Sequence, residues 1–143
     1  MDPSGLPIDG LTHVNFAFAY IKPETYEITT MDAATPANLF QTFADVRTFK
    51  SGNSDLKVFV SIGGWTFSDD GTKTQPLFGE IAGDEGKRQK FADNVVKFMN
   101  QYGFDGVDLD WEWVTSLASV LAPSANTKQI PWRPRSRWPA RGY

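Results

Sequence analysis

The sequence predicts an α/β fold in which helices cover a parallel β-sheet. Two observations support this prediction. The expected elements follow one another in the order strand, helix, strand, helix, strand, and the strands are nearly continuous apolar runs. The chain has 143 residues, which is enough for one domain with a sizeable core. Hydrophobic residues make up 41% and charged residues 22%, so the composition is that of an ordinary globular domain.

Three segments are expected to be strands. In residues 11–21 bulky side chains alternate with smaller ones, which gives the strand one bulky face. The bulky positions are Val14, Phe16, Phe18 and Tyr20. Residues 57–62 form the second expected strand and residues 106–111 the third. A polar loop is expected from Thr66 to about Gly83.

Two helices are expected between these strands. The first begins at Thr35-Pro36, which suit an N-cap and a first helical position, and ends near Gly52-Asn53. The second begins near Asp84 and ends at Gly103. Its apolar residues recur at helical spacing and form one stripe. They are Phe91, Val95, Phe98, Met99 and Tyr102.

The charges divide the chain into two parts. Residues 1–112 hold 9 Lys/Arg and 17 Asp/Glu, whereas residues 113–143 hold 5 Lys/Arg and no acid. The start of the second part could form about two helical turns through Val114, Leu117, Ala118 and Leu121. Residues 131–143 are rich in Pro, Arg and Trp, and we expect them not to fold around a core. Such a tail could touch nucleic acid or an acidic membrane surface, but we favour a disordered, mis-spliced or frame-shifted end.

Several classes of site are disfavoured by composition. The chain has no Cys, which excludes disulfides, a thiol nucleophile and zinc-thiolate sites. His13 is the single histidine, which argues against a histidine-based triad or a His-rich metal site. The residues after Met1 do not read as a signal peptide. No apolar run approaches the ~20 residues that a membrane-spanning helix needs.

The most informative segment is residues 105–112, which read Asp-Gly-Val-Asp-Leu-Asp-Trp-Glu. Asp108, Asp110 and Glu112 stand two residues apart, so in a strand they share one face, roughly 7 Å from one to the next. Burying acids together is unfavourable, because like charges and low dielectric both oppose ionisation. The pattern therefore indicates a functional site.

This octapeptide resembles the signature of glycoside hydrolase family 18, the chitinase family, whose pattern is Asp-Gly-x-Asp-x-Asp-x-Glu. The residues that fill the pattern are Asp105, Gly106, Asp108, Asp110 and Glu112. Upstream, Ser61-Ile62-Gly63-Gly64-Trp65 resembles the Ser-x-Gly-Gly motif of the preceding barrel strand in that family. The resemblance covers roughly residues 8–112, and residues 65–70 look like a fungal-type member.

The resemblance implies a (β/α)8 TIM barrel with its site at the C-terminal ends of the strands. Such a barrel takes about 250 residues. We therefore expect a partial barrel of about three parallel strands with two helices, plus an irregular C-terminal tail. Residues 1–113 would be a catalytic domain truncated at both ends, and residues 114–143 a non-homologous basic tail. Three strands would leave open edges and an inner face in contact with water.

Several expected family features have no counterpart in this chain. Trp113 and Val114 stand where the family commonly has Tyr and Pro. The later Met-x-Tyr-Asp segment of the family is missing, and so is the Trp of the last barrel strand. Trp132 and Trp138 do not replace that Trp, because nothing around them reads as a strand.

The resemblance also implies a reaction, the hydrolysis of β-1,4-linked N-acetylglucosamine polymers without metal or organic cofactor. Glu112 would be the general acid that protonates the glycosidic oxygen, and the N-acetyl carbonyl of the substrate would be the nucleophile, with net retention of configuration. Asp110 would orient and stabilise the acetamido group, and Asp108 would hold Asp110. We expect neighbouring carboxylates and an apolar barrel to keep Glu112 protonated.

The remaining motif residues have both a functional and a structural interpretation. Gly63 and Gly64 would let sheet and substrate approach closely, or they form a strand-end turn. Trp65 would be a sugar platform, although Trp65 and Trp111 are also plausible core residues. Asp105 is expected to fix the start of its strand or to cap the preceding loop. Gly106 and Ser61 complete the motifs as structural positions, and Phe16 and Phe18 are expected to pack in the barrel.

Three alternatives stay open at this point. Asp108 and Asp110 could hold a divalent metal ion. The chain could be a catalytically incompetent fragment or a chitin-binding, lectin-like protein. A metal-dependent phosphoryl-transfer enzyme could use the same acids, although the chain lacks a Gly-rich loop with Lys. The expected partners are chitin or chitooligosaccharides, with no nucleic acid and no membrane span. By resemblance the protein is extracellular, although no export signal is visible.

Overall fold

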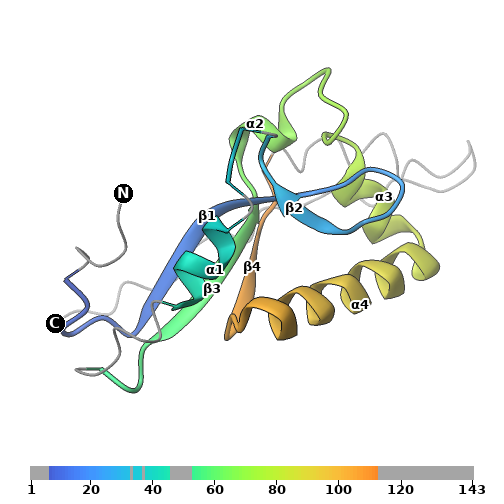
Figure 1. The fold of residues 1–143 in the computed structure, drawn as a ribbon. Helices are drawn as coiled ribbons and strands as arrows, with labels where there is room; N and C mark the ends of the chain where they lie inside the picture. The colour runs from blue at the N-terminus through green and yellow to red at the C-terminus, as the bar shows by residue number, and fades with distance from the viewer. Residues whose placement is uncertain (1–6, 33, 37, 46–52, 113–143) are drawn as a thin grey trace, which may run out of the picture.

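The computed structural model describes residues 7–32, 34–36, 38–45 and 53–112. In this part of the chain four strands form one sheet in the order β2-β1-β3-β4 (Figure 1). The strands β1 (His13–Ile21), β3 (Lys57–Gly63) and β4 (Gly106–Asp110) run parallel, and β2 (Ile28–Thr30) pairs antiparallel with β1. The predicted α/β fold with three parallel strands is confirmed.

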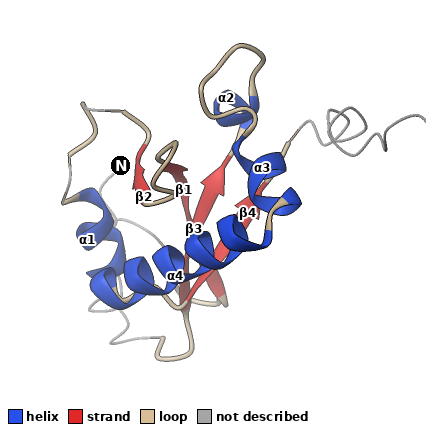
Figure 2. Cartoon of the chain, turned by 90° about the vertical axis from the view of Figure 1, so that its right-hand side faces the viewer, coloured by secondary structure: helices blue, strands red, loops and turns tan. Residues whose placement is uncertain are grey.

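The described helices are α1 (Leu39–Ala44), α2 (Trp65–Ser68), α3 (Leu77–Gly83) and α4 (Glu85–Tyr102). Figure 2 shows α4 running along one face of the sheet, with α1 near its C-terminal end and α3 at its N-terminal end. Both crossovers between parallel strands, from β1 to β3 and from β3 to β4, therefore place a helix on the same face, as right-handed connections require.

The core lies between this helical layer and the sheet. Val58, Val60 and Ile62 of the central strand β3 are fully buried. Around them, aromatic rings from the sheet and the helices pack edge to face: the ring of Phe40 lies 5.6 Å from that of Phe16 and 4.9 Å from that of Phe98. Aromatic burial of this kind supplies much of the hydrophobic stabilisation of a small domain.

The long helix α4 begins and ends where the sequence predicts. Its N-cap is Asp84, whose Oδ1 accepts a hydrogen bond from the Lys87 backbone N–H at 2.8 Å. Its C-cap is Gly103, which adopts a left-handed conformation with φ 85° and donates its N–H to the Met99 carbonyl. The predicted apolar stripe faces the core, because Phe91, Val95 and Phe98 are buried.

The first helix starts later than predicted. Thr35 does not cap it, because the Thr35 backbone N–H and hydroxyl both donate to Oδ1 of Asp32, at 2.8 and 2.9 Å. Asp32 thus closes a turn ahead of the helix, and α1 begins at Leu39. The predicted stop at Gly52 lies outside the described residues, and Asn53 donates to the carbonyl oxygen of Leu11 at 2.8 Å.

The prediction of one polar loop between Thr66 and Gly83 was wrong. The helix α2 begins at Trp65, and α3 ends at Gly83. These short helices bury Phe67, Leu77, Phe78 and Ile81. Their stability comes from tertiary packing, since helices of this length are marginal on their own. The prediction for the third strand was also one residue too long, because β4 ends at Asp110.

The hairpin that contains β2 was not predicted from the sequence. It is attached to α4 by side chains of the helix: Lys90 Nζ donates to the Glu24 carbonyl and Asn94 Nδ2 to the Thr25 carbonyl, both at 3.0 Å. Tyr26 at its tip is buried, and the Lys90 ammonium lies 5.4 Å from the centre of the Tyr26 ring. The expected tail, residues 114–143, lies outside the described residues.

We expect Asp84→Ala to lower the free energy of unfolding by about 1 kcal/mol, because it removes the N-cap of α4. Asp84→Asn is the control, since Asn caps about as well as Asp and should retain most of the stability. Urea unfolding followed by far-UV circular dichroism measures both. Equal stability of the Ala and Asn variants would show that this cap contributes nothing.

Candidate active site

The candidate site lies where β3 and β4 end side by side. The register pairs Ser61 with Asp108 and Gly63 with Asp110, so these residues share the face of the sheet away from the buried β3 valines. The Ser61 hydroxyl donates to Oδ2 of Asp108 at 2.8 Å, and Ser61 is almost fully buried. A buried hydroxyl on the central strand therefore orients the first of the three acids.

The three acids of the motif are accessible to solvent. Asp108 is exposed, and Asp110 and Glu112 are half-buried. Since β4 ends at Asp110, Glu112 follows the strand rather than lying within it. The observed exposure agrees with the expectation that the inner face of a partial barrel contacts water.

Two glycines allow the ends of β3 and β4 to approach each other. Gly63 has φ 117° and Gly64 has φ 87°, values that side-chain-bearing residues rarely adopt. The Gly64 N–H donates to the Asp110 carbonyl at 3.0 Å. A Cβ at Gly63 would collide with the Asp110 carbonyl oxygen and would lie 2.9 Å from the Phe78 ring. Glycine is thus needed at both positions, because the backbone has positive φ and other atoms lie where a side chain would begin.

The start of β4 is fixed by Asp105 and Gly106. Oδ2 of Asp105 accepts a hydrogen bond from the Val58 N–H at 2.8 Å, and the Asp105 N–H donates to the Val58 carbonyl at 2.8 Å. A Cβ at Gly106 would lie only 2.6 Å from Cζ of Phe59. These contacts set the register that places Asp108 beside Ser61, and they lie at the opposite end of the strand from Glu112.

Aromatic side chains differ in how far they reach solvent at this edge. Trp65, the first residue of α2, is 58% exposed and directly follows the two glycines. Trp111 is half-buried and stacks on Phe78, with ring centres 5.6 Å apart. Phe16 is buried, as expected, and Phe18 is partly buried with its ring against Gly64. Among these residues only Trp65 presents most of its surface.

Tyr20, near the end of β1, is a polar group at this edge that the motifs do not reveal. Burial raises the pKa of its hydroxyl, while a hydrogen bond with the Thr66 side chain acts in the opposite direction. Its ring lies edge-on to Phe67, 5.1 Å away between centres. The only sequence signal for Tyr20 was its place on the bulky face of the first strand.

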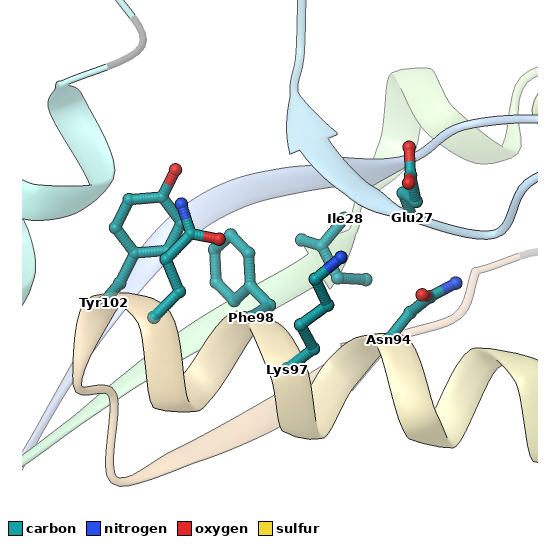
Figure 3. Close-up of a pocket in the computed structure, with 7 residues that line it drawn as sticks. Glu27, Ile28, Asn94, Lys97, Phe98 and Tyr102 are labelled. Atoms are coloured by element: carbon teal, nitrogen blue, oxygen red, sulfur yellow. The ribbon is translucent and has the colours of Figure 1, made fainter.

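Two hollows lie on the helical side of the sheet, away from the three acids. One is a polar crevice of about 120 Å³ between β2 and α4, into which Lys97 and Asn94 project beside Glu27 (Figure 3). The other is apolar and lies between β4, α3 and α4.

In the described part of the chain no three His, Cys, Asp or Glu side chains are grouped so that they could hold a metal ion. Nor does that part contain a helix long and apolar enough to cross a membrane.

Comparison with known proteins shows that the chain matches one family of glycosyl hydrolases. The family model described as "Glycosyl hydrolases family 18" matches residues 2–129. Chitinase B of Serratia marcescens is 35% identical over 103 residues, which are 72% of this chain and 20% of that protein. Chitinase 1 of Aphanocladium album is 32% identical over 127 residues, covering 78% of this chain and 28% of the relative. The chain thus spans between a fifth and a third of these relatives.

Solved structures show the same likeness. The chitinase of this family from Cycas revoluta in complex with (GlcNAc)3 has a TM-score of 0.61 at 26% identity, covering 85% of this chain and 36% of that one. The chitinase-like agglutinin of Robinia pseudoacacia has a TM-score of 0.60 at 27% identity, covering 79% and 31%. The predicted family and the partial barrel are confirmed. A fungal type is not singled out, because a relative from Medicago truncatula is also 32% identical. The boundary predicted after residue 113 stays a prediction.

We expect Gly63→Ala to destabilise the fold by more than Gly71→Ala does. Both glycines have positive φ, but a Cβ at Gly71 meets nothing within 4 Å, so that variant carries only the backbone cost of roughly 1–3 kcal/mol. The variant at Gly63 must in addition separate the ends of β3 and β4. Urea unfolding of both variants measures the difference. Equal losses would mean that β4 does not depend on this close approach.

Proposed function

The chain belongs to glycosyl hydrolases family 18, and from this premise we propose that it takes part in the hydrolysis of β-1,4-linked N-acetylglucosamine polymers. The observation that carries the proposal is the complete acidic motif at the C-terminal end of a parallel strand. Asp108 and Asp110 lie on β4, Glu112 directly follows it, and the glycine pair of β3 lies beside them. Active sites of barrel enzymes lie at this end of the strands.

In the proposed reaction Glu112 donates a proton to the glycosidic oxygen as the bond from that oxygen to the anomeric carbon breaks. The acetamido carbonyl oxygen of the substrate attacks the same carbon and forms a cyclic oxazolinium ion. Water then opens this ion, and the Glu112 carboxylate takes up the proton. Two successive displacements at one carbon retain its configuration. No metal or organic cofactor takes part.

The neighbouring acids support this proposed chemistry. Asp110 would stabilise the positive charge that develops on the acetamido group, and Asp108 would hold Asp110 in place. The hydrogen bond from Ser61 to Asp108 supports such a chain, because it ties the acid farthest from the scissile bond to the buried central strand. A side chain with a fixed partner costs less free energy to orient when the substrate binds.

We propose Trp65, which directly follows Gly63 and Gly64, as a sugar-stacking platform. Its exposure at the strand ends supports this role, because an exposed aromatic face is available to stack on a sugar ring. Chitin or chitooligosaccharides are therefore the proposed partners. An extracellular place of action rests on family resemblance alone and stays a prediction.

We expect Glu112→Gln to lower the turnover of a fluorogenic chitooligosaccharide by about 10²–10⁴-fold, because Gln cannot donate the proton. Glu85→Gln, on the exposed first turn of α4, is the matched control and should leave turnover unchanged. Circular dichroism checks that both variants fold.

Two results would contradict the proposed hydrolysis. In one, Glu112→Gln retains the turnover of the unchanged chain. In the other, the folded chain binds the oligosaccharide but releases no product, which leaves binding as its function.

We expect Trp65→Ala to weaken binding of an N-acetylglucosamine trimer by a factor of roughly 2–12, the equivalent of about 0.5–1.5 kcal/mol for one aromatic contact. Trp65→Phe should restore part of the affinity. Isothermal titration calorimetry on the Glu112→Gln background separates binding from turnover. Unchanged affinity in Trp65→Ala would remove Trp65 from the site.

A further inference from the structure

Tyr20, near the end of β1, carries a hydroxyl that the proposed reaction does not use. Just before Tyr20 the register of β1 against β3 moves by one residue, because Ala17 and Ala19 pair with consecutive residues of β3. Phe18 is thus an extra residue in β1, as in a β-bulge. Bulges redirect the side chains that follow them, and they are frequent next to active sites.

The extra residue turns Tyr20 toward the face of the sheet that carries the acids. Ala19 pairs with the buried Ile62 of β3, so Ala19 faces the helical layer. Ile21 is almost fully buried in the same core. Since side chains alternate along a strand, Tyr20 lies between these two residues on the opposite face, which is the face of Asp108.

Tyr20 contacts the first turn of α2 at two points. A hydrogen bond joins its hydroxyl to the side chain of Thr66, and its ring lies edge-on to the ring of Phe67, with centres 5.1 Å apart. Phe67 is fully buried, so the partner of the Tyr20 ring is itself fixed in the core. Thr66 and Phe67 directly follow Trp65. Tyr20 therefore connects the end of β1 with the helix that carries Trp65.

The helix α2 depends on contacts of this kind. It has four residues, and no side chain caps its N-terminus, where Gly64 adopts φ 87°. Figure 2 shows it just beyond the end of β3. A helix of one turn does not hold its conformation in isolation. The direction of its first residue, Trp65, is therefore set by the contacts that α2 makes with the rest of the molecule.

We propose that Tyr20 is a positioning residue for Trp65. Its hydroxyl holds Thr66, and with it the first turn of α2, so that the Trp65 ring faces a sugar chain lying along the strand ends. This inference rests on the proposed role of Trp65 in sugar stacking. A ring that is already held in place loses less freedom when the sugar binds, so Tyr20 increases the affinity without touching the sugar.

A double-mutant cycle on the full chain tests this role. Tyr20→Phe removes the hydroxyl but keeps the ring that packs on Phe67. On the Glu112→Gln background, we expect it to weaken binding of an N-acetylglucosamine trimer by roughly 2–5-fold, the effect of one net hydrogen bond. In Trp65→Ala the same substitution should weaken binding no further. Isothermal titration calorimetry measures all four affinities.

Two further variants serve as companions to Tyr20→Phe. Thr66→Val removes the other partner of the hydrogen bond, so it should cause a similar loss that does not add to that of Tyr20→Phe. Tyr26→Phe is the matched control, because Tyr26 is also buried and its hydroxyl is hydrogen-bonded to Lys87 of α4. That variant should leave the affinity for the trimer unchanged.

Two results of the cycle would overturn the proposal. If Tyr20→Phe keeps the affinity that Trp65→Ala loses, the sugar platform stands without help from Tyr20. If Tyr20→Phe weakens binding equally with and without the Trp65 ring, its hydroxyl does not act through Trp65.

A measurement without sugar separates this inference from the proposed function. The five tryptophans are replaced by fluorotryptophan, and Trp65→Phe assigns the fluorine NMR resonance of Trp65. We expect Tyr20→Phe to shift or broaden that resonance and Tyr26→Phe to leave it in place. An unchanged Trp65 resonance in Tyr20→Phe would overturn the positioning role, whether or not the chain hydrolyses the oligosaccharide.

Discussion

The close approach of β4 to the end of β3 is the constraint on which the candidate site depends. At the start of β4, Asp105 accepts from and donates to the backbone of Val58. At its end, the Asp110 carbonyl lies against Gly63 and accepts from the Gly64 N–H. These contacts fix the register of the strand at both ends. If the register of β4 against β3 shifted by one residue, Asp108 and Asp110 would point toward the helical layer. The position of the acids in the site therefore depends on these backbone contacts.

Much of the fold was predictable where the signals are local. The helix α4 carries its own start and stop in Asp84 and Gly103, and these act through contacts within a few residues. The helices α2 and α3 were missed because they are held by the burial of Phe67 and Ile81, which depends on the rest of the molecule. The start of α1 was missed for a related reason. The Thr35 N–H and hydroxyl donate to Asp32, so Thr35 does not act as the N-cap of the helix.

The residues of the candidate site were also predicted from the sequence, but the contacts between their side chains were not. Spacing alone places Asp108 and Asp110 on one face, yet the hydrogen bond from Ser61 to Asp108 follows from the pairing of two strands 47 residues apart. The same holds for Asp105, whose partner Val58 is equally distant along the chain.

The proposed chemistry is compatible with a site that shields its acids only partly from water. Electrostatic stabilisation is strongest where water is excluded, and Asp108 is exposed in the described structure. In a substrate-assisted reaction the nucleophile arrives with the substrate, so the protein supplies only an acid and a group that stabilises the acetamido charge. A polymer lying along the strand ends, with one sugar on Trp65, would itself displace water from Asp110 and Glu112. The burial that these acids need would then come from the substrate as it binds.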